Sequence, residues 1–353
     1  MKFIDLFAGI GGFRTGFEKE GFECVFSSEI DEECQEVYYN NYNEKPASDI
    51  TKIEPISLPD FDVLLGGFPC QPFSISGRKK GFEDTRGTLF FDICRIIEEK
   101  TPSVVVLENV KHIIHHDKGN TIKVIKDSLE SLDYFVEMKV LNSKDFGLPQ
   151  NRERIIIVAS KNKKFNFDLI EKNISKPLRY FLDKEGDFEY LNEDEYTLIE
   201  NPKKQSSGLI FVGYRNKNIW KKGIRPNTLH LSRVHRQPNR IYSIDGYHPT
   251  IPSQETAGRF FIYLPEENRV RKLTINECYR IMGFDDNFIK SKKNADRYKQ
   301  IGNSISINLV NEIAKNIIKQ GLLENEQISN ERCRKTKRII QSSFEIREER
   351  FAI

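Results

Sequence analysis

The stretch at residues 2–12, KFIDLFAGIGG, decides the fold of this chain. Residues 2–6 have the pattern of a strand, and the glycines that follow lead into a helix expected at 13–20. Glycines at such a turn let a ligand approach the backbone between strand and helix. The stretch therefore predicts the first strand, turn and helix of an α/β sheet that binds a ligand at the strand's carboxyl end.

The remainder of the first 160 residues alternates β-branched runs with helical patterns. This alternation is typical of a doubly wound parallel sheet. Strands are expected at 24–28, 62–65, 104–108, 135–140 and 154–160, with helices near 32–41, 88–99 and 120–132.

Beyond residue 161 the pattern becomes irregular and rich in Asn, Lys, Gly and Pro. Helical patterns return at 274–282 and 304–320. We therefore expect a sheet domain at 1–165, a smaller irregular domain at 166–260, helices at 261–322 that return to the first domain, and a charged tail at 323–353.

The composition excludes several classes of protein. Hydrophobic residues make up 38% and charged residues 30% of the 353 residues, which fits neither a membrane bundle nor a disordered polymer. There is no apolar run of the roughly 20 residues that a membrane helix needs and no secretory signal, so we expect a cytoplasmic protein without a membrane partner. The six cysteines are scattered, and His112, His115 and His116 have no acid or cysteine at ligand spacing; no metal is expected.

Charge is distributed unevenly along the chain. Residues 183–200 hold eight acidic residues and one basic residue, whereas 201–243 contain no Asp or Glu. The second segment carries ten Lys or Arg residues interleaved with Phe211, Tyr214 and Trp220. A basic segment with aromatic side chains is suited to a nucleic-acid backbone, although a solvated loop with ordinary lysines has the same pattern.

Two acidic residues in the first domain favour a nucleoside ligand. Glu29 follows Gly9 by 20 residues at the end of the next expected strand, where a carboxylate can bind both hydroxyls of a ribose. Asp49 is a candidate acceptor for an adenine amine, although an Asp at a turn is more often a cap. No GxxxxGK[ST] motif occurs, so hydrolysis of a nucleoside triphosphate is not expected.

Residues suited to covalent chemistry follow the expected strands. Cys70 lies between two prolines after the strand at 62–65, where a nucleophile would face the crevice outside the strand ends. Glu108 ends the strand at 104–108 and would face Cys70, unless it only caps the next helix. Gln150, Arg152 and Arg154 have a spacing of two, which directs all three side chains to one face of a strand.

These motifs together resemble the C5-cytosine DNA methyltransferases of bacterial restriction-modification systems. Several motifs in the family's order are far more specific than any one of them. The resemblance covers residues 3 to about 316 and rests on DLFAGIGG (5–12), Glu29, Asp49, GFPCQPFS (67–74), ENV (108–110), QNRER (150–154) and QIGNS (300–304).

The resemblance implies a Rossmann-like AdoMet-dependent methyltransferase sheet with a smaller, irregular target-recognition domain at 166–260. S-adenosylmethionine would be the cofactor. Cys70 would be the nucleophile, Glu108 would hydrogen-bond the cytosine, and Arg152 and Arg154 would steady the base. The cofactor-binding residues would be Phe7, Gly9, Ile10, Gly12, Glu29, Ile30, Asp49, Ile50, Gly67, Pro69, Asn303 and Ser304.

The same resemblance implies double-stranded DNA as partner. A cytosine inside a stacked duplex is out of reach, so the base would be flipped out, with the glycine-containing segment at 75–87 closing over the DNA. The DNA-binding residues would be Ser76, Arg78, Arg233, Arg236, Gln237, Arg240 and Thr250.

Other functions remain open at this point. A tRNA cytosine-5 methyltransferase uses the same catalytic residues, and a catalytically silent DNA-binding relative would keep the fold alone. For the leading interpretation we expect a monomeric bacterial protein associated with the nucleoid. It would act beside a companion restriction endonuclease with which it forms no stable complex.

Overall fold

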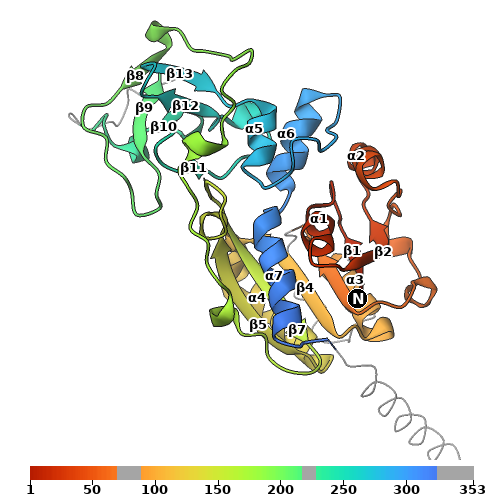
Figure 1. Cartoon of the computed structure of the whole chain (residues 1–353). Helices are drawn as coiled ribbons and strands as arrows, with labels where there is room; N and C mark the ends of the chain where they lie inside the picture. The colour runs from red at the N-terminus through yellow and green to blue at the C-terminus, as the bar shows by residue number, and fades with distance from the viewer. Residues whose placement is uncertain (70–88, 217–227, 324–353) are drawn as a thin grey trace, which may run out of the picture.

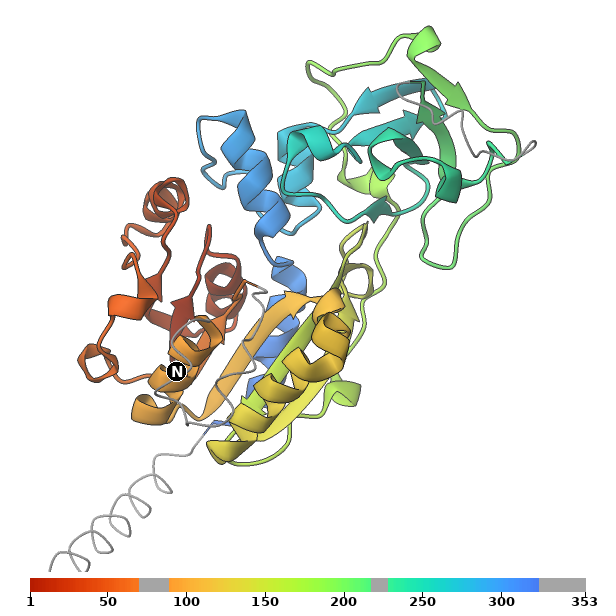
Figure 2. The same cartoon turned by 180° about the vertical axis from the view of Figure 1, so that it is seen from behind.

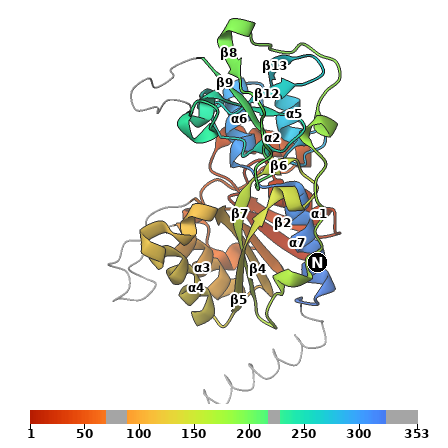
Figure 3. The same ribbon diagram turned by 90° about the vertical axis from the view of Figure 1, so that its left-hand side faces the viewer.

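The computed structural model describes residues 1–69, 89–216 and 228–323. Its two larger sheets lie at opposite ends of the molecule (Figures 1 and 3). The elements before the second sheet are β1 (Lys2–Leu6), α1 (Gly12–Glu18), β2 (Glu23–Ser28), α2 (Glu32–Tyr42), β3 (Val63–Gly66), α3 (Leu89–Lys100), β4 (Val104–Val110), α4 (Asn120–Ser131), β5 (Phe135–Asn142), β6 (Gln150–Asn151) and β7 (Glu153–Ser160). They are followed by β8 (Tyr196–Leu198), β9 (Phe211–Arg215), β10 (Arg240–Ser243), β11 (His248–Pro249), β12 (Phe261–Leu264), β13 (Arg269–Lys272), α5 (Ile275–Arg280), α6 (Asn294–Asn303) and α7 (Ile307–Lys319).

The first sheet has the strand order β2-β1-β3-β4-β7-β5. Strands β1 to β4 pair in parallel, as predicted, but β7 is antiparallel to both β4 and β5. The prediction of a fully parallel sheet was therefore wrong at this edge. The connection at 143–152 is too short for the crossover that a parallel pairing requires, so the chain turns back on itself.

Helices cover both faces of this sheet. Val104 and Val106 of β4 face one hydrophobic core, into which α1 and α7 pack, whereas Val105 and Leu107 face the other, beneath α3 and α4. Figure 1 shows α7 in front of the sheet, and Figure 2 shows α4 on the opposite side. Burial on both faces explains the apolar runs of the inner strands β3, β4 and β7.

The second sheet has the order β13-β12-β10-β9-β8, in which only β10 and β12 are parallel. The smaller domain thus contains regular structure that the sequence pattern did not predict. Its last two strands, β12 and β13, lie past the boundary expected at residue 260. The helix expected at 304–320 begins at Ile307, and the preceding helix α6 was not predicted.

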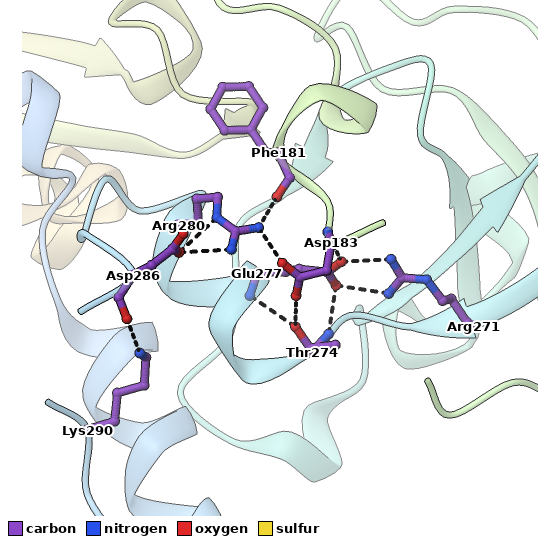
Figure 4. A network of polar contacts seen from close by, with 8 residues as sticks. All are labelled: Phe181, Asp183, Arg271, Thr274, Glu277, Arg280, Asp286 and Lys290. Atoms are coloured by element: carbon purple, nitrogen blue, oxygen red, sulfur yellow. Dashed lines mark hydrogen bonds and ion pairs between the residues drawn. The ribbon is translucent and has the colours of Figure 1, made fainter. Parts of the chain in front are cut away.

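Backbone pairing and a buried ion pair are among the contacts that join the parts of the molecule. Strand β11 pairs in parallel with β6, with His248 beside Gln150. A buried ion pair also links β13 to α5: Arg271 Nη1 donates to Glu277 Oε2 at 2.9 Å and Arg271 Nη2 to Oε1 at 2.7 Å (Figure 4). Glu277 also accepts hydrogen bonds from the backbone N–H groups of Thr274 and Asp183. The ion pair therefore holds together β13, the start of α5 and the segment at Asp183.

Candidate active site

A cavity of about 470 Å³ opens at the carboxyl ends of β1 to β4 and is closed on one side by the end of α6. It lies where a parallel sheet is expected to bind its ligand. Glu108 and Arg154 line it, as do all the residues for which cofactor binding was predicted: Phe7, Gly9, Ile10, Gly12, Glu29, Ile30, Asp49, Ile50, Gly67, Pro69, Asn303 and Ser304.

The turn after β1 has an uncommon backbone conformation. Phe7, Gly9 and Gly11 all have positive φ angles, of 57°, 56° and 85°. A Cβ on Gly11 would lie 2.4 Å from a ring carbon of Tyr42, so glycine is required there for packing as well as for backbone conformation. A Cβ on Gly9 would meet nothing within 4 Å, and this glycine leaves the wall of the cavity open. Phe7 keeps its strained conformation at the cavity, as residues at functional sites often do.

Backbone hydrogen bonds orient the Glu29 carboxylate. The N–H of Gly9 donates to Oε2 and that of Asp31 to Oε1, each at 2.8 Å. Gln35 fixes the same segment by donating to the Glu29 carbonyl. Each carboxylate oxygen retains a further lone pair for a ligand in the cavity. Such an arrangement would suit the two hydroxyls of a ribose, the role that the spacing of Gly9 and Glu29 predicts.

Asp49 is a cap residue, one of the two roles that its sequence context left open. Its Oδ1 caps a 3-10 turn by accepting hydrogen bonds from the backbone N–H and the hydroxyl of Thr51. These hydrogen bonds hold the pKa of the Asp49 carboxyl below its ordinary value. Asp49 also lines the cavity, so its carboxylate is available there as a hydrogen-bond acceptor.

Glu108 and Arg154 form an ion pair at the cavity wall, with 2.8 Å between Arg154 Nε and Glu108 Oε1. Both side chains are largely buried. Burial raises the pKa of Glu108 in spite of the opposing charges of Arg154 and Arg152. The adjacent Asn109 donates to the carbonyl of Phe68 at 2.8 Å and thereby ties the end of β4 to the segment after β3. Burial therefore makes Glu108 easier to protonate than an exposed glutamate, while Arg154 fixes its position.

Arg152 differs from the expectation for a catalytic residue. It is 1% exposed and does not line the cavity. Its Nη2 donates to the carbonyls of Gly302 and Ser304, at 2.9 and 2.5 Å. The spacing of two residues predicts that Gln150, Arg152 and Arg154 share one face of a strand. In the structure only Arg154 faces the cavity, whereas Gln150 donates to the carbonyl of Ile281. Arg152 therefore holds the segment that carries Asn303 and Ser304.

Sequence reasoning missed an ion pair at the cavity. Lys299 of α6 contacts Asp31, and both residues line the cavity. Asp31 is also the N-cap of α2, since its Oδ1 accepts from the N–H groups of Glu33 and Cys34. An Asp before a helix that begins with two acidic residues is a capping signal that could have identified Asp31. No local pattern indicates that α6, about 270 residues later, supplies its partner.

The predicted DNA-binding residues do not line the cavity. Arg233, Arg236 and Gln237 are exposed in the second part of the molecule. Arg240 is half-buried and donates to the His235 carbonyl, and Thr250 donates to the Asn151 carbonyl.

Three further predicted residues, Cys70, Ser76 and Arg78, lie outside the described residues. Pro69, which directly precedes Cys70 in the chain, lines the cavity. Within 1–69, 89–216 and 228–323 there is no group of His, Cys, Asp and Glu side chains that could hold a metal ion, and no helix long and apolar enough to cross a membrane.

Comparisons with known proteins identify the family of this chain. The family model of the C-5 cytosine-specific DNA methylases matches residues 1–319. The Type II methyltransferase M.HhaI of Haemophilus parahaemolyticus is 43% identical over 323 residues, which cover 90% of this chain and 94% of that protein. M.NgoBI of Neisseria gonorrhoeae, also named a Type II methyltransferase, is 42% identical over 88% of this chain and 90% of its own length.

Solved structures show a similar fold. The Dnmt2 methyltransferase of S. pombe has a TM-score of 0.65 at 18% identity, covering 91% of this chain and 99% of that one. A DNMT2 mutant of Spodoptera frugiperda has a TM-score of 0.64 at 17% identity over 90% of this chain and 99% of that one. At these identities the likeness concerns the fold alone.

Proposed function

Because the chain belongs to the C-5 cytosine-specific DNA methylases, it is a DNA cytosine methyltransferase, and we propose that it uses S-adenosylmethionine to methylate C5 of one cytosine in a short duplex sequence. The observation that carries this proposal is the single cavity in which the cofactor candidates meet the buried Glu108–Arg154 pair. Pro69 at its edge precedes the nucleophile candidate Cys70 in the chain.

The residues around the cavity fit S-adenosylmethionine. Glu29 presents a fixed carboxylate for ribose hydroxyls, Asp49 an acceptor for the adenine amine, and Phe7 an aromatic side chain for the adenine ring. Asn303 and Ser304 supply polar groups for the methionine end. When bound, the cofactor supplies an electrophilic methyl group on a sulfonium.

Covalent catalysis explains why the chemistry needs these residue types. C5 of cytosine is a weak nucleophile, so the thiolate of Cys70 first forms a bond to C6, which makes C5 electron-rich. Glu108, whose pKa is raised by burial, would present a proton to N3 in a hydrogen bond while electron density builds on the ring. Arg154 orients Glu108 and adds positive charge beside the base. After methylation a base takes the C5 proton, the C6–S bond breaks and the thiolate leaves.

We propose double-stranded DNA as the partner, with the target cytosine flipped out of the duplex. The second sheet and its acid-free basic segment would bind the DNA around the target site. The protein would act as a monomer in the bacterial cytoplasm, in association with the nucleoid. A companion restriction endonuclease would cleave the same unmethylated sequence without forming a stable complex with it.

The test is to express the chain in a bacterial host that lacks cytosine methylation and to map 5-methylcytosine across the genome at base resolution. We expect methylation at one recurring short sequence, and none from Cys70→Ala. Purified wild-type protein would then be assayed with duplex DNA and with tRNA. Transfer to tRNA alone would refute the DNA assignment, and turnover by Cys70→Ala would refute the nucleophile.

A further inference from the structure

Residues 228–240, which we call the recognition loop, hold most of the candidate DNA contacts. Arg233, Arg236 and Gln237 are exposed there, and the surrounding segment at 201–243 contains no acidic residue. A loop can distinguish base pairs only if its side chains reach the groove in a defined arrangement. The backbone hydrogen bonds that form the loop's two short 3-10 turns lie within the loop, so its position on the sheet depends on further contacts.

His235 is the first such contact. It is 6% exposed, although its neighbour Arg236 is exposed. Its ring stacks on Tyr214 of β9, with 3.9 Å between ring centroids and an interplanar angle of 17°. Nε2 lies 2.7 Å from the carbonyl oxygen of Leu229, and because a carbonyl only accepts, Nε2 carries the proton. The His235 carbonyl accepts from Arg240 Nε at 3.0 Å. His235 thus ties both ends of the loop to the sheet.

Gly258 is the second contact, and it comes from a different segment. Its φ of 67° and ψ of −153° are open essentially to glycine alone. A Cβ there would lie 2.3 Å from Pro238 Cα and 2.5 Å from the Pro238 carbonyl oxygen. These are backbone atoms, so any larger residue would displace the loop next to Gln237.

We propose that His235 and Gly258 are positioning residues that set the DNA sequence preference of this protein. Neither residue needs to touch DNA. His235 holds the loop against the sheet, and Gly258 leaves room for the backbone of Pro238. The exposed side chains of Arg233, Arg236 and Gln237 are thereby directed toward the base edges. The inference rests on the proposed DNA methylation and deepens it by locating what makes the recognition specific.

The expected effect is a loss of discrimination. A mismatched base pair ordinarily reduces binding about 5- to 150-fold in a site-specific protein. With the loop displaced, phosphate contacts by its basic side chains persist while base contacts are lost. We therefore expect the preference for the consensus over sites with one changed base pair to fall by about tenfold or more, while cofactor affinity stays unchanged.

Three variants separate the contacts. His235→Phe keeps an aromatic ring for the stack but removes the donor to Leu229, and His235→Gln keeps an amide donor but removes the stack. Gly258→Ala tests the second anchor without altering the first. Gly21→Ala is the matched control, because Gly21 also has a positive φ, of 78°, but its Cβ would meet nothing within 4 Å.

Each protein is expressed in the methylation-free host, 5-methylcytosine is mapped, and cofactor affinity and thermal unfolding of the purified protein are measured. The inference is supported if the His235 variants and Gly258→Ala methylate a relaxed or altered consensus sequence while Gly21→Ala keeps the wild-type consensus. Should one variant fail to fold, the others decide. Wild-type discrimination in folded variants, or a loss of rate in equal proportion at all sites, overturns it. Absence of methylation by the wild type would instead refute the proposed function.

Discussion

Replacing Arg152 with Met tests whether this residue is catalytic or positions the cofactor site. Met retains much of the apolar stem but cannot donate to the carbonyls of Gly302 and Ser304. Each buried acceptor left without a donor costs about 1–3 kcal/mol, so about 2–6 kcal/mol of folding free energy is at stake. Removal of a buried cation offsets part of that loss, because burial disfavours the charged guanidinium.

Two measurements on Arg152→Met distinguish the roles. Denaturant unfolding should show a loss of about 2 kcal/mol or more. Titration calorimetry with S-adenosylmethionine should show affinity reduced about tenfold, which corresponds to about 1.4 kcal/mol, since Asn303 and Ser304 lose their support. Arg154→Met is the matched control: it removes the partner of Glu108 at the cavity and should lower turnover far more than cofactor affinity.

The reasoning would be refuted by an Arg152→Met protein of wild-type stability and cofactor affinity whose turnover alone is lost. That result would restore the contact of Arg152 with the target cytosine that the family resemblance implies.

Three further changes probe other parts of the structure. Glu29→Ala should weaken cofactor binding by about 10- to 150-fold through loss of charge-assisted hydrogen bonds, and an unchanged dissociation constant would contradict the ribose role. Burial raises the pKa of Asp5 to about 8 from 3.8, so its contribution to stability is greatest below pH 4 and falls until about pH 8. Asp5→Asn should remove this pH-dependent loss of stability, which is on the order of a few kcal/mol. If the unfolding curves of the variant shift between pH 5 and pH 9 as much as those of the wild type, Asp5 is not its cause. Glu277→Ala leaves Arg271 buried without its partner and should destabilise the fold by about 3–5 kcal/mol, measured by denaturant unfolding; a loss below about 1 kcal/mol would show that the pair is not structural.

The sequence alone determined those features that depend on neighbouring residues. The strand, turn and helix at residues 2–18 follow from hydrophobic period and glycine conformation, and Gly9 and Glu29 follow the carboxyl ends of the adjacent parallel strands β1 and β2. The short motifs that carry the family resemblance named the cofactor candidates, and all of them line one cavity. Local patterns also located most strands of the first sheet within one or two residues, since their apolar runs are bounded by turn residues.

Only the tertiary structure decided which distant segments meet. Spacing could not show that Arg152 turns away from the cavity toward Gly302 and Ser304, because that depends on where the C-terminal segment packs. Nor could it reveal the contact of Lys299 with Asp31, or of Gly258 with Pro238. Backbone preference and hydrophobic period act over a few residues, whereas these contacts depend on the packing of whole elements, which no local pattern encodes.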